Sequence, residues 1–94
     1  MSAPDRSSDH LKAVGEEFVV WREVDGEAVV LDLRTSRYLS LNEAARLMWA
    51  ELVRGTTRVH LEETLATVYE LEPDDAARDV AKFLAQCRER LLLA

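Results

Sequence analysis

The spacing of the apolar residues along the chain changes at Asn42. Over residues 37–41 (RYLSL) polar and apolar side chains alternate, which predicts a strand with one buried face. From Asn42 onward the apolar residues recur every three or four positions, which predicts a helix capped by Asn42 with Glu43 in its first turn. Because only Asn42 separates the two elements, the strand cannot turn back to pair with the next segment of the chain. One side of this strand is therefore expected to be unpaired.

Residues 16–33 (EEFVVWREVDGEAVVLDL) predict a β-hairpin. Asp25 and Gly26 are the pair that a two-residue type I′ turn favours, because both central residues need positive φ. The alternating apolar residues of the second strand are Val29, Leu31 and Leu33. A second turn at 34–36 leads into strand 37–41. The sequence thus predicts a three-stranded antiparallel sheet in which residues 37–41 form an edge.

Three helices are predicted after the sheet. The first runs from about residue 43 to 54 and stops at Gly55, which suits the left-handed position after a helix. The second starts near Thr57 or Arg58 and ends at the Glu-Pro pair whose Pro73 opens the third. The apolar face of the third helix is wide and consists of Ala76, Val80, Phe83, Leu84, Cys87 and Leu91. We expect one flank of this face to meet the core and the other to line a groove. The predicted fold class is α+β, a winged helix-turn-helix with a three-stranded antiparallel sheet followed by three α-helices.

A chain of 94 residues makes one small domain with a single core. Its start is polar, so we expect residues 1–15 to be a disordered tail and residues 16–94 to be the folded domain. The start is unlike a signal peptide, and no apolar run approaches the roughly 20 residues that span a bilayer. A single cysteine permits no internal disulfide and suits a reducing compartment. We therefore expect a cytoplasmic protein without a membrane partner.

The formal net charge of −6 argues against a nucleic-acid partner, because phosphate binding needs clustered lysine and arginine. The helix-turn-helix pattern still leaves a small winged-helix DNA-binding regulator as a less favoured alternative. Its recognition helix would be the third, whose first turn carries Asp74 and Asp75. These carboxylates would face phosphates and base edges, whereas Arg88 and Arg90 lie at the other end of the helix.

The candidate catalytic residues do not form a recognisable arrangement. Cys87 lies on the apolar face of the third helix and is expected in the core. His10 falls in the predicted tail and His60 in the first turn of a helix, so these residues give no metal signature. The three glycines are scattered and form no phosphate-binding loop. We therefore expect no enzymatic activity, no cofactor and no metal.

The unpaired side of strand 37–41 is the remaining candidate for function. Edge strands are usually protected by charge, proline or a bulge. Here Arg37 supplies one charge, and residues 38–41 contain neither charge nor proline. An extended peptide could add along residues 37–41 as a further strand and place alternate side chains in an apolar groove. The alternative is that the third helix covers this edge, and the residues alone leave both open.

Asp79 is expected at the rim of such a groove. It precedes the apolar Val80 and lies beside Phe83 on the helical wheel, away from the solvent face. There it would read a polar or cationic group of a bound peptide. The alternatives are a structural salt bridge, for example to Arg37, and an exposed side chain without a role.

Two stretches, DGEAVVLDLRTSRYLSLNEAARLMWAELVRGTT and LATVYELEPDDAARDVAKFLAQCRERLL, closely resemble the PqqD-like family, the RiPP recognition elements. The resemblance extends from about residue 17 to 93. Its most specific parts are the junction 38–42 with Trp49, and the residues Asp79-Val80 and Phe83-Leu84 of the last helix. The spacing from Asn42 to Trp49 is most similar to that of the stand-alone recognition proteins of bacterial lasso-peptide biosynthesis. Ser36 stands where the family usually has glycine.

The resemblance implies a winged helix-turn-helix that binds peptides without catalysing a reaction. Family members bind the leader segment of a ribosomally synthesised precursor peptide, which pairs with the third strand and packs against the third helix. They deliver it to a maturation enzyme, which in lasso systems is a separate cysteine leader peptidase. Tyrosine, proline and leucine side chains of the leader are expected to enter apolar pockets. The expected leader-binding residues are Arg37, Tyr38, Leu39, Ser40, Leu41, Ala76, Asp79, Val80, Phe83 and Cys87.

Two alternatives remain within the family. One is a PqqD-type peptide chaperone that serves a radical SAM enzyme, and the other is a recognition module of another RiPP class. Neighbouring genes would separate them, because a transglutaminase-like protease and an asparagine-synthetase-like cyclase imply lasso chemistry.

Overall fold

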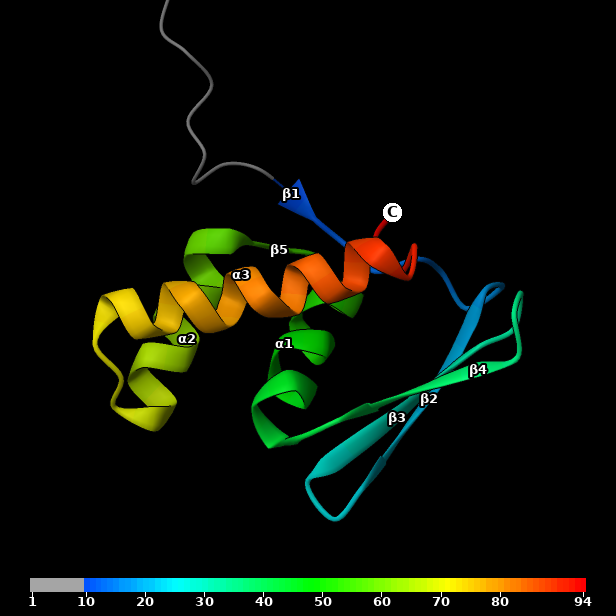
Figure 1. Cartoon of the computed structure of the whole chain (residues 1–94), viewed down its shortest axis with the longest axis horizontal. Helices are drawn as coiled ribbons and strands as arrows, with labels where there is room; N and C mark the ends of the chain where they lie inside the picture. The colour runs from blue at the N-terminus through cyan, green and yellow to red at the C-terminus, as the bar shows by residue number, and fades with distance from the viewer. Residues whose placement is uncertain (1–9) are drawn as a thin grey trace, which may run out of the picture.

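The computed structural model describes residues 10–94. Its elements in chain order are β1 (His10–Leu11), β2 (Val19–Val24), β3 (Glu27–Asp32), β4 (Arg37–Leu41), α1 (Glu43–Arg54), β5 (Thr56–Thr57), α2 (Arg58–Tyr69) and α3 (Pro73–Glu89). The sheet of β2, β3 and β4 lies to one side of the helices, and α3 runs across the molecule from α2 toward the sheet (Figure 1). This arrangement confirms the predicted α+β fold of a three-stranded antiparallel sheet followed by three helices.

The sheet has the order β2-β3-β4, and neighbouring strands pair antiparallel, so β4 is an edge strand as predicted. Asp25 (φ 51°) and Gly26 (φ 81°) both have the positive φ that the type I′ turn needs. Ser36 (φ 60°) adopts the left-handed conformation in the turn between β3 and β4. Asn42 alone separates β4 from α1, and its side-chain oxygen accepts the backbone N–H of Ala45 at 2.9 Å.

The face of β3 that turns toward the core is not the face with the larger apolar side chains. Ala28, Val30 and Asp32 are buried, whereas Val29 and Leu31 are only half-buried on the outer face of the sheet. The carboxylate is tolerated inside because it is hydrogen-bonded within the turn after the strand. Alternation in the sequence predicts two faces but does not say which of them is buried.

The helices begin as predicted, but α3 ends early. α1 stops before Gly55 (φ 96°), and Pro73 opens α3. α3 ends at Glu89, and Leu91 (φ 58°) is 69% exposed, so the prediction that Leu91 extends the apolar face is wrong. The left-handed turn at this residue places Leu92 in the core instead. Within residues 10–94 no helix is both long and apolar enough to cross a membrane.

The chain before β2 belongs to the fold from residue 10 onward, which corrects the predicted disordered tail of residues 1–15. β1 pairs antiparallel with β5. Ala13 is buried and donates its backbone N–H to the carbonyl of Leu52 at 2.8 Å. The tail was predicted because the residues at the start of the sequence are mostly polar. The apolar residues that follow them nevertheless pack against the core. Residues 1–9 of the predicted tail lie outside the described residues.

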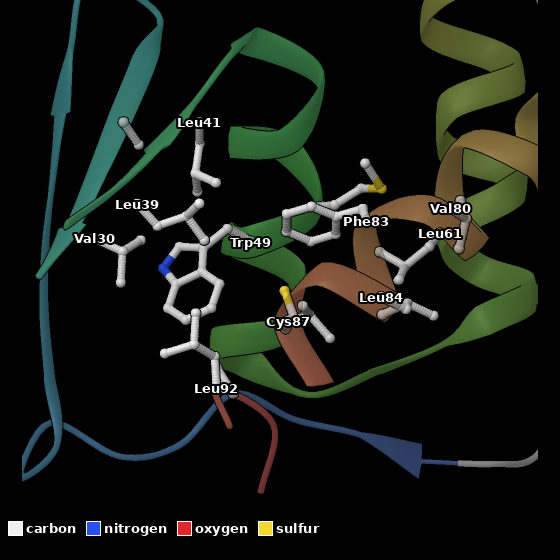
Figure 2. Close-up of a cluster of buried hydrophobic side chains, with 14 of the residues drawn as sticks. Val30, Leu39, Leu41, Trp49, Leu61, Val80, Phe83, Leu84, Cys87 and Leu92 are labelled. Carbon is white, nitrogen blue, oxygen red and sulfur yellow. The ribbon is translucent and has the colours of Figure 1, made fainter. Parts of the chain in front are cut away.

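One hydrophobic core joins the sheet, the helices and both terminal segments. Figure 2 shows Trp49 of α1 between Leu39 of β4 and Leu92, with its indole nitrogen on the side of Val30. Trp49 is fully buried, which agrees with its large apolar area. The residues labelled in Figure 2 are Val30, Leu39, Leu41, Trp49, Leu61, Val80, Phe83, Leu84, Cys87 and Leu92.

Candidate functional site

The hydrogen-bond pattern of the sheet decides which backbone groups of β4 are free. In an antiparallel pair, residues directly opposite each other alternate between exchanging both backbone hydrogen bonds and exchanging none. The two-residue turn makes Val24 and Glu27 a bonded pair, and Leu33 donates its N–H to the carbonyl of Phe18 at 2.8 Å. The odd-numbered residues of β3 therefore bond to β2, and its even-numbered residues bond to β4.

The partners of these even-numbered residues on β4 are Arg37, Leu39 and Leu41. The N–H and C=O groups of Tyr38 and Ser40 consequently point away from β3. A direct contact agrees with this assignment, because Arg90 Nη1 donates to the carbonyl of Tyr38 at 3.4 Å. We call the outward backbone groups of Tyr38 and Ser40 the free edge.

A groove of about 680 Å³ lies between β4 and the end of α3, and we call it the edge groove. Its lining residues are Val30, Asp32, Thr35, Arg37 and Leu39 from the sheet and its turn, and Glu89, Arg90, Leu91 and Leu92 from the end of α3. The buried side chains of Val30, Leu39 and Leu92 give it an apolar floor. Charged side chains form its rim. The side chains of an extended chain paired with the free edge would alternate between this groove and solvent.

Asp32 and Arg34 tie the turn between β3 and β4 to the end of α3. The Asp32 carboxylate accepts the backbone N–H of Arg34 at 2.9 Å and its Nε–H at 3.1 Å. Arg34 Nη2 in turn donates to the carbonyl of Leu91 at 2.8 Å, and its guanidinium lies 5.2 Å from the centroid of the Phe18 ring. The side-chain hydrogen bond from Arg34, followed by the backbone one, lowers the pKa of Asp32 from its ordinary value. This network fixes the width of the edge groove at one end.

Four of the five predicted leader-binding residues of β4 lie at the free edge or beside it. Arg37 and Leu39 line the edge groove. Tyr38, which is 66% exposed, and the exposed Ser40 carry the free backbone groups. Leu41 is buried in the core. The structure thus brings four of these five residues together around one edge.

The predicted leader-binding residues of α3 do not line the edge groove. Ala76, Val80, Phe83 and Cys87 are at most 4% exposed and belong to the core. Asp79 is exposed, and it forms no ion pair within the described residues, so the alternative of a salt bridge to Arg37 is not present. A role of these residues in peptide contact stays a prediction.

Sequence reasoning missed the part of the groove that residues 89–92 form. Their position depends on the chain reversal at Leu91, which has positive φ without being a glycine or asparagine. The sequence offers one signal that could have indicated this site. Asp32 and Arg34 stand two residues apart at the end of a strand, where a carboxylate on the core side needs a partner.

Cys87 lies in the core as predicted. Burial raises the pKa of its thiol to about 12, so the thiol stays protonated at neutral pH. A reactive cysteine needs the opposite shift and an accessible sulfur. Within residues 10–94 no three histidine, cysteine, aspartate or glutamate side chains are grouped as metal ligands.

A family model described as coenzyme PQQ synthesis protein D (PqqD) matches residues 27–93. The chain belongs to the PqqD family. The match includes β3, β4 and all three helices, and hence every lining residue of the edge groove. No curated protein matches the chain.

Two solved structures that contain leader peptides are similar to this PqqD-family chain. One is TbiB1 in complex with the TbiA(beta) leader peptide, with 26% identity and a TM-score of 0.79, covering 87% of this chain and 93% of that chain. The other is lasso peptide synthetase B1 complexed with the leader peptide, with 28% identity and a TM-score of 0.73, covering 82% of this chain and 91% of that chain. These matches confirm the resemblance that was drawn from the sequence.

Proposed function

We propose that this protein binds the leader segment of a ribosomally synthesised precursor peptide, of the lasso-peptide class, and catalyses no reaction itself. The observation that carries the proposal is the free edge of β4 beside a groove with an apolar floor. The similarity to two structures that hold leader peptides supports the same conclusion. Family membership alone would leave the peptide class open.

The leader would bind as an additional strand of the sheet. Tyr38 and Ser40 each offer one backbone donor and one acceptor, which would bond to alternate residues of the leader. We expect antiparallel pairing, the commoner arrangement. Every second leader side chain would then enter the edge groove. Backbone pairing would give the register, and the side chains in the groove would give the selectivity.

The bound leader would be presented to a separate cysteine leader peptidase in the cytoplasm. Holding the precursor on a protein that also contacts the peptidase raises the effective concentration of the scissile bond at the enzyme. This contribution requires no catalytic group, cofactor or metal on the present chain. The buried Cys87 with its raised pKa is in keeping with a binding role.

Amide hydrogen exchange tests the proposed binding mode. The probe is a synthetic leader segment of a candidate lasso precursor peptide. On binding, the amides of Tyr38 and Ser40 should gain protection, because they have no partner in the sheet. The amides of Leu39 and Leu41 already bond to β3 and serve as internal controls. Unchanged protection at Tyr38 and Ser40 in the presence of bound leader would contradict strand addition at β4.

A proline substitution gives an independent check on the same edge. Ser40→Pro removes an N–H that points away from β3, and proline is tolerated on an edge strand in that orientation. The variant should keep its fold by circular dichroism and bind the leader about tenfold more weakly, since one backbone hydrogen bond is lost. Normal affinity in the folded variant would show that the Ser40 donor is not used.

The description of the matching family favours one second candidate, a peptide chaperone that serves a radical SAM enzyme in coenzyme PQQ synthesis. It would use the same free edge, with another peptide and another partner enzyme. Titration with a PQQ precursor peptide, run beside the lasso leader, separates the two candidates. Preferential binding of the PQQ precursor would replace the lasso assignment and leave the strand-addition mode intact.

A further inference from the structure

Two arginine side chains reach across the end of the edge groove in opposite directions. Arg34 extends from the turn after β3 and donates to the carbonyl of Leu91 at 2.8 Å. Arg90 extends from the residue after α3 and donates to the carbonyl of Tyr38 at 3.4 Å. The first contact ties the turn to the chain after α3, and the second joins that chain to β4.

The two arginines differ in how firmly they are held. Arg34 is paired with the buried Asp32 and lies over the Phe18 ring. Arg90 is exposed, and within the described residues no carboxylate lies within ion-pair distance of its guanidinium. Its hydrogen bond is also the longer of the two. Arg90 is therefore the side chain that can leave its position at small cost.

The carbonyl that Arg90 occupies is an atom that strand addition uses. A further strand would lie about 4.8 Å from β4 in the plane of the sheet and donate an N–H to Tyr38. The guanidinium of Arg90 reaches this carbonyl from the same open side. The guanidinium of Arg90 and the N–H of an added strand cannot occupy this side of the Tyr38 carbonyl at the same time. Charged side chains over an open edge are also a general means of preventing two sheets from joining.

We propose that Arg90 caps the free edge of β4 in the peptide-free protein and that an added strand must displace it. This inference rests on the proposed function, because the strand that displaces Arg90 is the leader. The cap would satisfy the Tyr38 carbonyl until a better-aligned backbone donor arrives. Arg90 would thus make the edge selective for a chain that also fills the edge groove.

The cap is tested first without any peptide. Arg90→Ala should shift the carbonyl-carbon resonance of Tyr38 and the amide resonance of Leu39, which belongs to the same peptide group. The matched control is Arg88→Ala, which removes the same charge from an exposed position in the last turn of α3. Arg88→Ala should leave both resonances in place. If Arg90→Ala also leaves them in place, Arg90 does not cap the edge.

Binding kinetics with the synthetic leader test the displacement. Removing a weak competing hydrogen bond should raise the association rate of Arg90→Ala by about 2- to 5-fold over wild type, whereas Arg88→Ala should match wild type. Slower association or weaker affinity of Arg90→Ala would show that Arg90 supports the bound leader, which overturns the proposal. If the leader binds neither wild type nor either variant, the proposed function fails, and displacement fails with it. The resonance of the Tyr38 carbonyl still decides separately whether the cap exists.

Discussion

Asp32 is the carboxylate on which one end of the edge groove depends. It is 8% exposed and faces the core side of β3, where an unpaired charge would be costly. Its hydrogen bonds hold Arg34, and Arg34 holds the carbonyl of Leu91. The loss of this one negative charge would release both the turn between β3 and β4 and the chain after α3.

The lowered pKa of Asp32 predicts how stability depends on pH. A carboxyl whose pKa is lower in the folded state contributes stability above its unfolded value, here 3.8, and loses it as pH falls through the folded value. Asp32→Asn should therefore lower the free energy of unfolding at pH 7, and the difference from wild type should shrink below pH 3.8. Urea unfolding of wild type and variant at pH 7 and at a pH below 3.8 measures this difference in the free energy of unfolding. Asp79→Asn, at an exposed position without an ion pair in the described chain, is the control. A pH-independent difference would mean that Asp32 acts through packing and not through its charge.

Among the elements, the turn between β3 and β4 sets the register of the edge strand. Ser36 has a φ of 60° and donates its backbone N–H to the carbonyl of Asp32 at 2.8 Å. The left-handed conformation costs a residue with a side chain about 1–2 kcal/mol, whereas glycine adopts it freely. The turn therefore forms with serine at the position where the family usually has glycine, at some cost in stability.

Ser36→Gly should stabilise the protein. Relief of the left-handed strain outweighs the extra flexibility of glycine in the unfolded chain, so the expected gain is about 0.5–1 kcal/mol. Ser36→Val should destabilise by about 1 kcal/mol, because a β-branched residue fits positive φ worst. Urea midpoints of the two variants and wild type give the order. Equal midpoints for glycine and serine would mean that the turn carries no strain.

Elements could be predicted from the sequence where local chemistry decides them, and could not where tertiary contacts do. The two-residue turn at Asp25-Gly26, the Asn42 cap and Pro73 at the start of α3 are local signals, and each is found as predicted. The inner face of β3 was not predictable, because the buried Asp32 depends on a partner outside the strand. The free edge could be found from the direct passage of β4 into α1. The groove beside it depends on the left-handed Leu91.

At the scale of the whole molecule, the segment before β2 is hydrogen-bonded to the chain after α3, which lines the edge groove. Val14 donates its backbone N–H to the carbonyl of Leu92 at 2.9 Å, and Ala94 donates to the carbonyl of Lys12 at 2.8 Å. Leu92 is part of the apolar floor of the groove. The two ends of the described chain thus hold each other, and they hold the chain after α3 in place next to β4 (Figure 1).

The terminal pairing can be tested with a chain that begins at residue 10 and one that begins at residue 15. The shorter chain loses the pairing of β1 with β5, the backbone hydrogen bonds of Lys12, Ala13 and Val14, and the apolar cover that this segment gives the core. At about 1 kcal/mol for each hydrogen bond, with a small apolar contribution, the loss in stability should be about 3–6 kcal/mol by urea unfolding. Because Leu92 loses its partner, the shorter chain should also bind the leader more weakly at a temperature where both chains are folded. Equal stability would show that the terminal pairing contributes nothing to the fold. Reduced stability with unchanged leader affinity would show that the floor of the edge groove does not contribute to leader binding. Binding would then depend on the free edge alone.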